Sequence, residues 1–173
     1  MPMRVYLLFA FLPFTLSCLT KQNHFDAEKW YEQTKSKILE QSNLIADDTL
    51  KEYYDNGGVH AIKLLNNGHL IIQKLYTWTG EQVTETNFSS DGTFELRKEI
   101  CKDGQIAFEG IFHNGEAYGL SRWWRCDKSK IEEGIRFKNN KIGSWKKWDK
   151  NGNVTETNYQ SDNLIDSLTL IRL

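Results

Sequence analysis

Beyond residue 47, most of the chain consists of short segments rich in Ile, Val, Phe, Tyr, Trp and Thr that are separated by polar turn residues. Segments of this composition, bounded by turn residues, are typical of β-strands. Turn-forming dipeptides separate the segments, and their second residues follow one another at intervals of 11 to 13 positions: Asn56-Gly57, Asn67-Gly68, Thr79-Gly80, Asp91-Gly92, Asp103-Gly104, Asn114-Gly115, Asp127-Lys128, Asn139-Asn140 and Asn151-Gly152. Because Asn-Gly and Asp-Gly supply the positive φ angles of tight hairpin turns, the pattern predicts about ten short strands in a meandering antiparallel sheet.

The expected strands also repeat in sequence. Two strands with their turns make a unit of about 24 residues, and several short motifs return at that interval. Glu109-Gly110-Ile111 returns as Glu133-Gly134-Ile135, Gly119 returns as Gly143, Trp124 returns as Trp148, and segment 83–88 returns at 154–159 after about three units. A sheet of β-hairpin repeats is therefore the expected fold.

A different pattern precedes the sheet. Residues 25–45 contain no Gly or Pro and are rich in Glu, Lys and Gln. Their apolar residues recur on one helical stripe, which consists of Ala27, Tyr31, Ile38 and Ile45. Asn23 or Asp26 has a side chain suited to capping the start of this helix. We therefore expect a mainly β fold with one N-terminal helix.

The first 18 residues have the features of an export signal. Arg4 precedes an apolar run over residues 5–16, which is followed by Ser17 and Cys18. A helix of about 12 residues is ~18 Å long, well short of the ~30 Å hydrocarbon core of a bilayer, so we expect cleavage rather than a permanent span. The expected organisation is a signal peptide (1–17), a linker with the helix (18–46), the β-repeat domain (47–163) and a C-terminal tail (164–173).

The Ser17-Cys18 pair resembles the lipobox of bacterial lipoproteins. That resemblance implies that Cys18 is acylated, becomes the new N-terminus and anchors the chain to a membrane of the cell envelope. The alternative is simple cleavage near Ser17, which would leave a soluble periplasmic or secreted protein. The mature chain is expected outside the cytoplasm in both cases.

The repeat residues resemble those of a known family. Glu109-Gly110-Ile111-Phe112-His113-Asn114-Gly115, followed by Gly119 and Trp123, is similar to the membrane occupation and recognition nexus (MORN) repeat, with Ser121 at a position where that repeat has glycine. Lys51-Glu52-Tyr53-Tyr54-Asp55-Asn56-Gly57 and Gly143-Ser144-Trp145-Lys146-Lys147-Trp148 resemble units of the related YwqK-type antitoxin family. The resemblance covers about residues 51–159. It implies a hairpin-repeat sheet that binds a protein partner, and for the antitoxin family that partner is a toxin.

Side-chain alternation assigns the tryptophans to two faces of the sheet. Trp124 and Trp148 are expected on one face with Leu120 and Ile142, as core residues. Trp123 and Trp145 fall on the opposite face, where Arg125 and Lys147 make them the candidate contact surface, because Trp and Arg are enriched at interface hot spots. The alternative is that the N-terminal helix, with Trp30 and Tyr31, covers this second face and makes these tryptophans structural.

Charge and cysteine content add little chemistry. The chain has 22 basic and 23 acidic residues, so no broad field attracts nucleic acid. Cys101 and Cys126 are candidates for a disulfide, although a regular meander would place them two strands apart, about 9–10 Å, beyond the ~7 Å limit for bridged Cα atoms. No catalytic, cofactor-binding or metal-binding motif occurs in the sequence.

The sequence therefore favours a non-enzymatic envelope lipoprotein whose repeat sheet binds a protein, with an antitoxin or immunity role implied by the family resemblance. The alternative is a membrane-surface or scaffold adaptor that binds lipid or glycan. An enzyme would require a deep pocket with convergent polar groups that motifs do not show. No cofactor is expected, and the sequence leaves the oligomeric state open.

Overall fold

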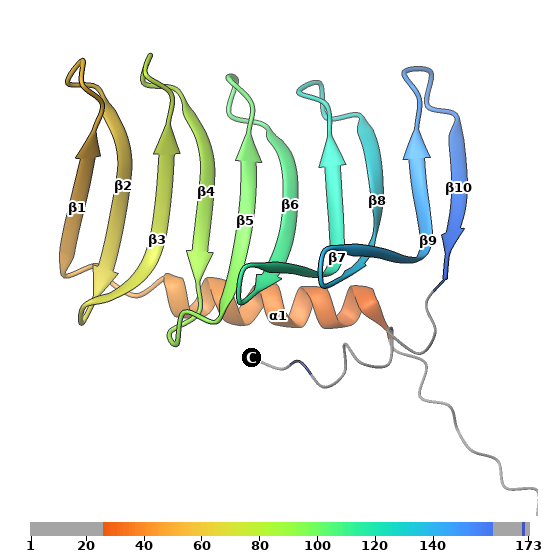
Figure 1. Cartoon of the computed structure of the whole chain (residues 1–173), viewed down its shortest axis with the longest axis horizontal. Coiled ribbons are helices and arrows are strands. Elements are labelled where there is room, and N and C mark those ends of the chain that lie inside the picture. The colour runs from red at the N-terminus through yellow and green to blue at the C-terminus, as the bar shows by residue number, and fades with distance from the viewer. Residues whose placement is uncertain (1–25, 161–170, 172–173) are drawn as a thin grey trace, which may run out of the picture.

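The computed structural model describes residues 26–160 and 171, and these form one helix and one ten-stranded antiparallel sheet (Figure 1). The strands follow one another in chain order from one edge of the sheet to the other, which confirms the predicted meander. The elements are α1 (Ala27–Ser42), β1 (Asp48–Tyr53), β2 (Val59–Asn66), β3 (His69–Tyr76), β4 (Gln82–Phe88), β5 (Phe94–Ile100), β6 (Ile106–His113), β7 (Glu116–Trp124), β8 (Lys130–Phe137), β9 (Asn140–Trp148) and β10 (Val154–Tyr159). The expected signal peptide, Cys18 and most of the expected tail lie outside the described residues.

The predicted helix is present but shorter than expected. Asp26 caps it by accepting a hydrogen bond from the Lys29 N–H (3.0 Å). Its buried residues are Tyr31, Thr34, Ile38 and Ser42, which recur at helical spacing. Ile45 was expected on this stripe, but it lies beyond the helix end and is 88% exposed. Of the helices in the described part of the chain, none is long and apolar enough to cross a membrane.

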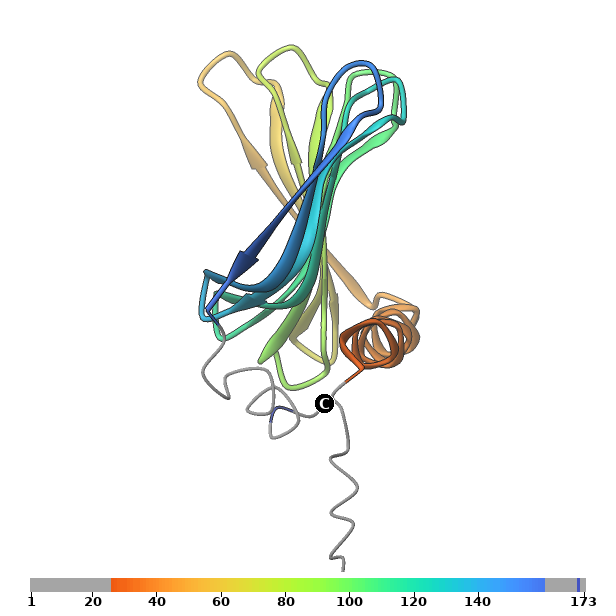
Figure 2. The same ribbon diagram turned by 90° about the vertical axis from the view of Figure 1, so that its right-hand side faces the viewer.

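The helix packs across the lower halves of the strands, on one face of the sheet (Figure 2). It packs against β3, β4, β5 and β7, and its side chains also reach Glu109 of β6. The main core lies beneath it and consists of Tyr31, Ile38, Phe94, Leu96 and Ile111, with Trp30, Leu39, Leu120 and Ile171 packed against them. A smaller cluster pairs Tyr118 with Ile142. Of the described elements, α1 alone lies on this face, and it covers the lower half of it.

The expectation that Trp124 and Trp148 are core residues is therefore wrong, although they share a face with Leu120 and Ile142 as expected. Both are half-buried, and neither belongs to a core cluster of the described residues. They lie near the upper ends of β7 and β9, beyond the reach of α1. Ile142 is buried as expected, and Leu120 packs against the main core.

The turns occur where the dipeptides predict them, with one shift. At the lower ends of the strands, Asn67-Gly68 and Asn114-Gly115 have positive φ at both positions. The next lower turn uses Lys138 (φ 49°) and Asn139 (φ 68°) in the same way, rather than Asn139-Asn140 as predicted. The dipeptide therefore predicted the position of this turn to within one residue. Phe137 pairs with Asn140, which leaves Lys138 and Asn139 as the two turn residues.

Candidate functional site

Aromatic side chains form a row across the sheet face that lies opposite α1. We call this row the aromatic ladder; it consists of Phe112, Phe108, Trp123, Trp145 and Tyr159. Neighbouring ring centroids are 6.3, 4.8, 5.9 and 6.3 Å apart in that order. The row continues across β6, β7, β9 and β10 because Gly134 of β8, which has no side chain, lies opposite Trp145 in the register.

Cationic side chains lie over the rings of the ladder. The Arg97 guanidinium is 4.0 Å from the Phe112 ring centroid, and the Lys141 ammonium is 4.1 Å from that of Trp145. Arg136 is 5.3 Å from the rings of both Trp123 and Trp145. Burial lowers the pKa of the Arg136 guanidinium, whereas the nearby Glu132 carboxylate acts in the opposite direction. These cation–π contacts position the charges at the surface of the ladder.

Trp145 forms the rigid base of the ladder. Its side chain is 2% exposed, and its Nε1–H donates to the Ile135 carbonyl at 3.0 Å. The ring occupies the space beside Gly134, where a Cβ would lie 2.2 Å from Trp145 Cδ2. The expectation that Trp145 forms part of an accessible contact surface is therefore wrong. Because Gly134 on the adjacent strand has no side chain, the Trp145 indole packs directly against the sheet.

The other residues of the predicted contact surface differ in their roles. Trp123 remains half-buried on the ladder face, and Lys147 is exposed there. Arg125 instead holds an upper turn together: its guanidinium donates to the carbonyls of Lys130 (2.8 Å) and Trp148 (3.1 Å). The face that carries Trp123 is not covered by α1, as the alternative required, because the helix packs on the opposite face of the sheet.

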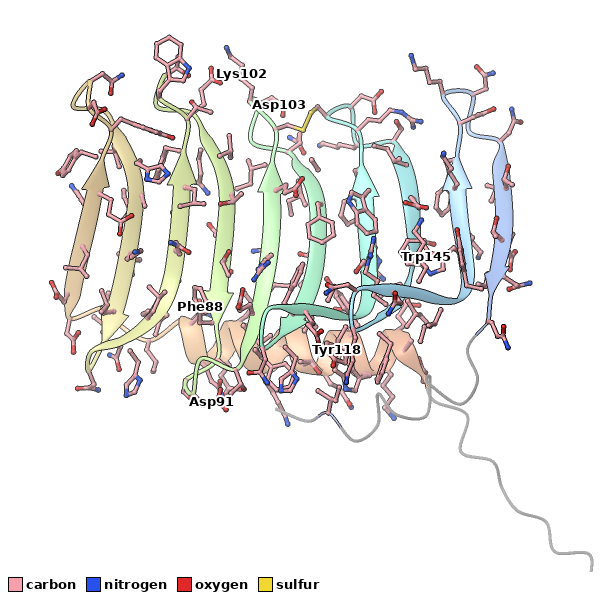
Figure 3. All side chains as sticks on the ribbon, viewed as in Figure 1. Phe88, Asp91, Lys102, Asp103, Tyr118 and Trp145 are labelled. Carbon is pink, nitrogen blue, oxygen red and sulfur yellow. A yellow bond between two sulfur atoms is a disulfide. The ribbon has the colours of Figure 1, made fainter. Side chains whose placement is uncertain are left out.

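Cys101 and Cys126 form a disulfide with Cα atoms 5.7 Å apart, beside the turn labelled by Lys102 and Asp103 (Figure 3). The separation of about 9–10 Å that a regular meander predicted for the Cα atoms of these two cysteines is therefore wrong. Cys101 begins its upper turn by donating to the Gln105 carbonyl (2.8 Å), and Arg125 has the equivalent place in the next upper turn. Cys126 lies one residue further into that turn. The bridge thus joins loop positions, which strand spacing does not constrain.

A buried polar cluster connects α1 to the sheet, and sequence reasoning missed it. Glu109 is 5% exposed and accepts hydrogen bonds from the Tyr31 hydroxyl (2.5 Å) and the Lys35 ammonium (2.7 Å). Burial, followed by the charge of Glu109 and its hydrogen bond, raises the pKa of the Tyr31 phenol. Arg122 adds ion pairs to Glu28 (2.8 Å) and Glu32 (3.4 Å). The one available signal was the return of Glu109 as Glu133 at repeat spacing.

Two recesses flank this cluster above α1, and both are lined by Arg122. One has a volume of about 330 Å³ and is bordered by Lys35, Glu109, Trp124 and Lys128. The other has a volume of about 400 Å³ and lies over β8 and β9. No three His, Cys, Asp or Glu side chains lie close enough to hold a metal ion within residues 26–160 and 171. The carboxylates at both recesses already accept ion pairs, as Glu109 does from Lys35 and Glu133 does from Lys130.

No protein-family model and no curated protein matches the chain. A chain in the crystal structure of accessory secretory proteins 1, 2 and 3 of Streptococcus pneumoniae is similar, with 12% sequence identity and a TM-score of 0.38. The match covers 73% of this chain and 24% of that chain, so this chain spans about a quarter of its length. A likeness this weak carries no argument about function.

Proposed function

We propose that the chain is a non-catalytic binding module that is held at a membrane surface through a lipid on Cys18 and recognises an acidic protein. The observation that carries the proposal is the aromatic ladder, which lies on the face that α1 leaves open. Trp123 is its accessible indole, and it lies on a base of buried rings. Trp side chains on a rigid, partly desolvated base are typical of interface hot spots.

The charge around Trp123 favours an acidic partner. On the ladder face of β7–β10, which the structure describes completely, the cations are Arg136, Lys141 and Lys147. The carboxylate on the same face of these strands is Glu132, and it is paired with Lys141. Arg136 and Lys147 therefore form no ion pair on this face of these strands. Complementary charge speeds the encounter of partners and selects against basic ones.

The similarity to MORN repeats supports a binding role for the sheet, and the disulfide supports a location outside the cytoplasm. Disulfides persist in oxidising compartments and are rare in the cytosol. Cys101 and Cys126 are bonded to each other, which leaves Cys18 as the third cysteine of the chain. Because Cys101 and Cys126 are bonded to each other, neither of them competes with Cys18 as the site of the lipid.

The partner is tested by affinity capture from native envelopes with the tagged full-length protein. We expect Trp123→Ala combined with Lys147→Glu to lose the captured protein. Trp78→Ala is the matched control, because Trp78 is 70% exposed in an upper turn far from the ladder. Equal capture by the ladder variant and the control would refute the ladder as the binding surface.

The anchor is tested separately by metabolic labelling with an alkyne fatty acid. We expect labelling of the wild-type protein and its loss in Cys18→Ser. The double variant Cys101→Ser/Cys126→Ser should keep the label, because it retains Cys18 and both substitutions are distant from the export signal in sequence. Labelling that survives Cys18→Ser would exclude Cys18 as the lipid site.

A further inference from the structure

The last strand of the sheet repeats a central strand. Segment 154–159 in β10 reads V-T-E-T-N-Y, and segment 83–88 in β4 reads V-T-E-T-N-F. The two strands also have the same surroundings on one side. Glu85 lies opposite Lys74 of β3, and Glu156 lies opposite Lys146 of β9. Strand β10 is therefore a second copy of β4 in both sequence and register.

The first strand of the sheet resembles β5 in the spacing of its charged residues. Asp48, Lys51 and Glu52 of β1 have the spacing of Glu95, Lys98 and Glu99 of β5. Each strand has a register shift at the same place, between Glu52 and Tyr53 in β1 and between Glu99 and Ile100 in β5. Each then enters an equivalent upper turn, closed by a backbone hydrogen bond of 2.8 Å.

Within the molecule, β4 and β5 are neighbours. Their register places Glu85 opposite Lys98 and Thr84 opposite Glu99. Glu85 forms ion pairs with Lys98 (3.2 Å) and with Lys74 (3.5 Å), so its carboxylate bridges two strands. Opposite charges directly across an antiparallel pair stabilise that pairing and its register.

The copies of these two strands are the free edges of the sheet. Strands β1 and β10 lie at its opposite ends, and every residue of both is exposed (Figure 1). Half of the large hydrophobic side chains exposed in the described part of the chain lie on these two strands: Leu50, Tyr53, Val154 and Tyr159. An exposed edge with unpaired backbone groups is a template for another strand, and natural sheets ordinarily protect it.

We propose that the occupant of each edge is a second copy of this chain, with β10 of one molecule pairing antiparallel to β1 of the next. The β4–β5 register, transferred to this junction, places Glu156 opposite Lys51 of the next copy, Thr155 opposite Glu52 and Tyr159 opposite Asp48. Glu156 then lies between Lys146 and Lys51, as Glu85 lies between Lys74 and Lys98.

The faces of the two edges agree with this junction. Lys51 lies opposite Ile62, which lies opposite Lys74, so that Lys51 shares the face of Glu85. This is the α1 face, because Lys98 lies opposite Glu85 and is two positions from Leu96, which is buried under α1. Residues two positions apart in a strand lie on the same face. Lys146 lies opposite Glu133, which lies opposite Arg122, the residue that contacts α1. Glu156 is therefore also on the α1 face, and α1 would lie on the same side of every copy.

Such a junction joins unlike edges, so each added copy presents a new free edge. Heterologous contacts of this kind generate open chains of molecules unless rotation closes them into a ring. The junction is made by the backbone edges of β1 and β10 and shares Tyr159 with the aromatic ladder, but it does not involve Trp123. It is therefore a second interaction, separate from the proposed binding of a partner at Trp123. Trp123→Ala should leave it intact.

The test is sedimentation velocity of the full-length protein over a range of concentrations, with charge reversals at the two edges. We expect Lys51→Glu and Glu156→Lys each to raise the dissociation constant for self-association by about tenfold or more. An equal mixture of the two variants should associate again, because each supplies the charge that the other lacks. Lys150→Glu, in the exposed turn before β10, is the matched control and should behave as the wild type.

Cysteine cross-linking tests the register directly and guards against variants that simply misfold. A chain that carries both Glu52→Cys and Thr155→Cys should form disulfide-linked dimers and higher oligomers on non-reducing gels. Either substitution alone should form none. A wild-type protein that stays monomeric at all concentrations, an assembly insensitive to both charge reversals, or cross-linking by Thr155→Cys alone would each overturn the proposal.

Discussion

The ring of Trp30 in α1 occupies the space beside Gly119 in β7, where a Cβ would lie 2.3 Å from Trp30 Cζ3. Gly119 also has a φ of 68°, which a residue with a side chain rarely adopts. Trp30 Nε1–H donates to the Ile171 carbonyl (3.0 Å), so the indole connects the helix, the sheet and a residue near the C-terminus. This contact joins α1 closely to β7.

We therefore expect Gly119→Ala to lower the free energy of unfolding by about 2–4 kcal/mol, since overpacking adds to backbone strain. Gly104→Ala is the control, because Gly104 also has positive φ (83°) but has no atom within 4 Å of the added Cβ. Urea unfolding followed by circular dichroism measures both variants. Equal losses would mean that the Trp30 contact contributes nothing.

Trp145 should behave as a core residue in spite of its place on the open face. Trp145→Ala removes a buried ring and leaves a cavity above Gly134, so we expect a loss of about 3–5 kcal/mol. Trp78→Ala removes the same side chain from a site that is 70% exposed and should change stability by less than about 0.5 kcal/mol. Chemical denaturation measures the free energy of unfolding of both variants. A small effect of Trp145→Ala would contradict the structural role of Trp145.

Reduction of the disulfide should destabilise the protein without changing its fold. Cys101 and Cys126 are 25 positions apart. Removing a bridge that closes a loop of this size lowers the free energy of unfolding by about 3–4 kcal/mol, because the unfolded chain gains conformational entropy. We expect a lower unfolding midpoint in dithiothreitol and the same loss in Cys101→Ser/Cys126→Ser. The double variant should be insensitive to dithiothreitol; if it responded like the wild type, the bridge would not be the cause.

Tyr31→Phe should have an effect that depends on pH. At neutral pH the loss of the hydrogen bond to Glu109 should cost about 1–3 kcal/mol. The folded protein raises the pKa of the Tyr31 phenol, so its stabilising contribution is complete below the unfolded value of about 10 and declines as pH rises above it.

The difference in stability between wild type and Tyr31→Phe should therefore shrink between about pH 9 and pH 11. Tyr53→Phe is the control, because Tyr53 is 60% exposed on β1. Denaturant unfolding at a series of pH values measures both differences. A Tyr31 difference that stays constant over this range would show that the fold does not raise the pKa of the phenol.

Strand alternation correctly placed Trp123 and Trp145 on one face, since that assignment needs no more than the period of a strand. It could not show that Trp145 is buried. That outcome depends on Gly134, which strand pairing places opposite Trp145 from 11 positions earlier in the chain. The sequence displayed Gly134 as a repeat motif, but a motif does not reveal which ring fills the space beside it.

The order, number and direction of the strands followed from the sequence alone. Dipeptides with positive φ and alternation with a period of two act over a few residues, so they are legible without knowledge of the fold. The tertiary structure decided which face α1 covers, how Tyr31 meets Glu109 across 78 positions, and how two turns bring Cys101 to Cys126. These outcomes depend on contacts between residues distant in sequence, and packing in three dimensions selects such contacts.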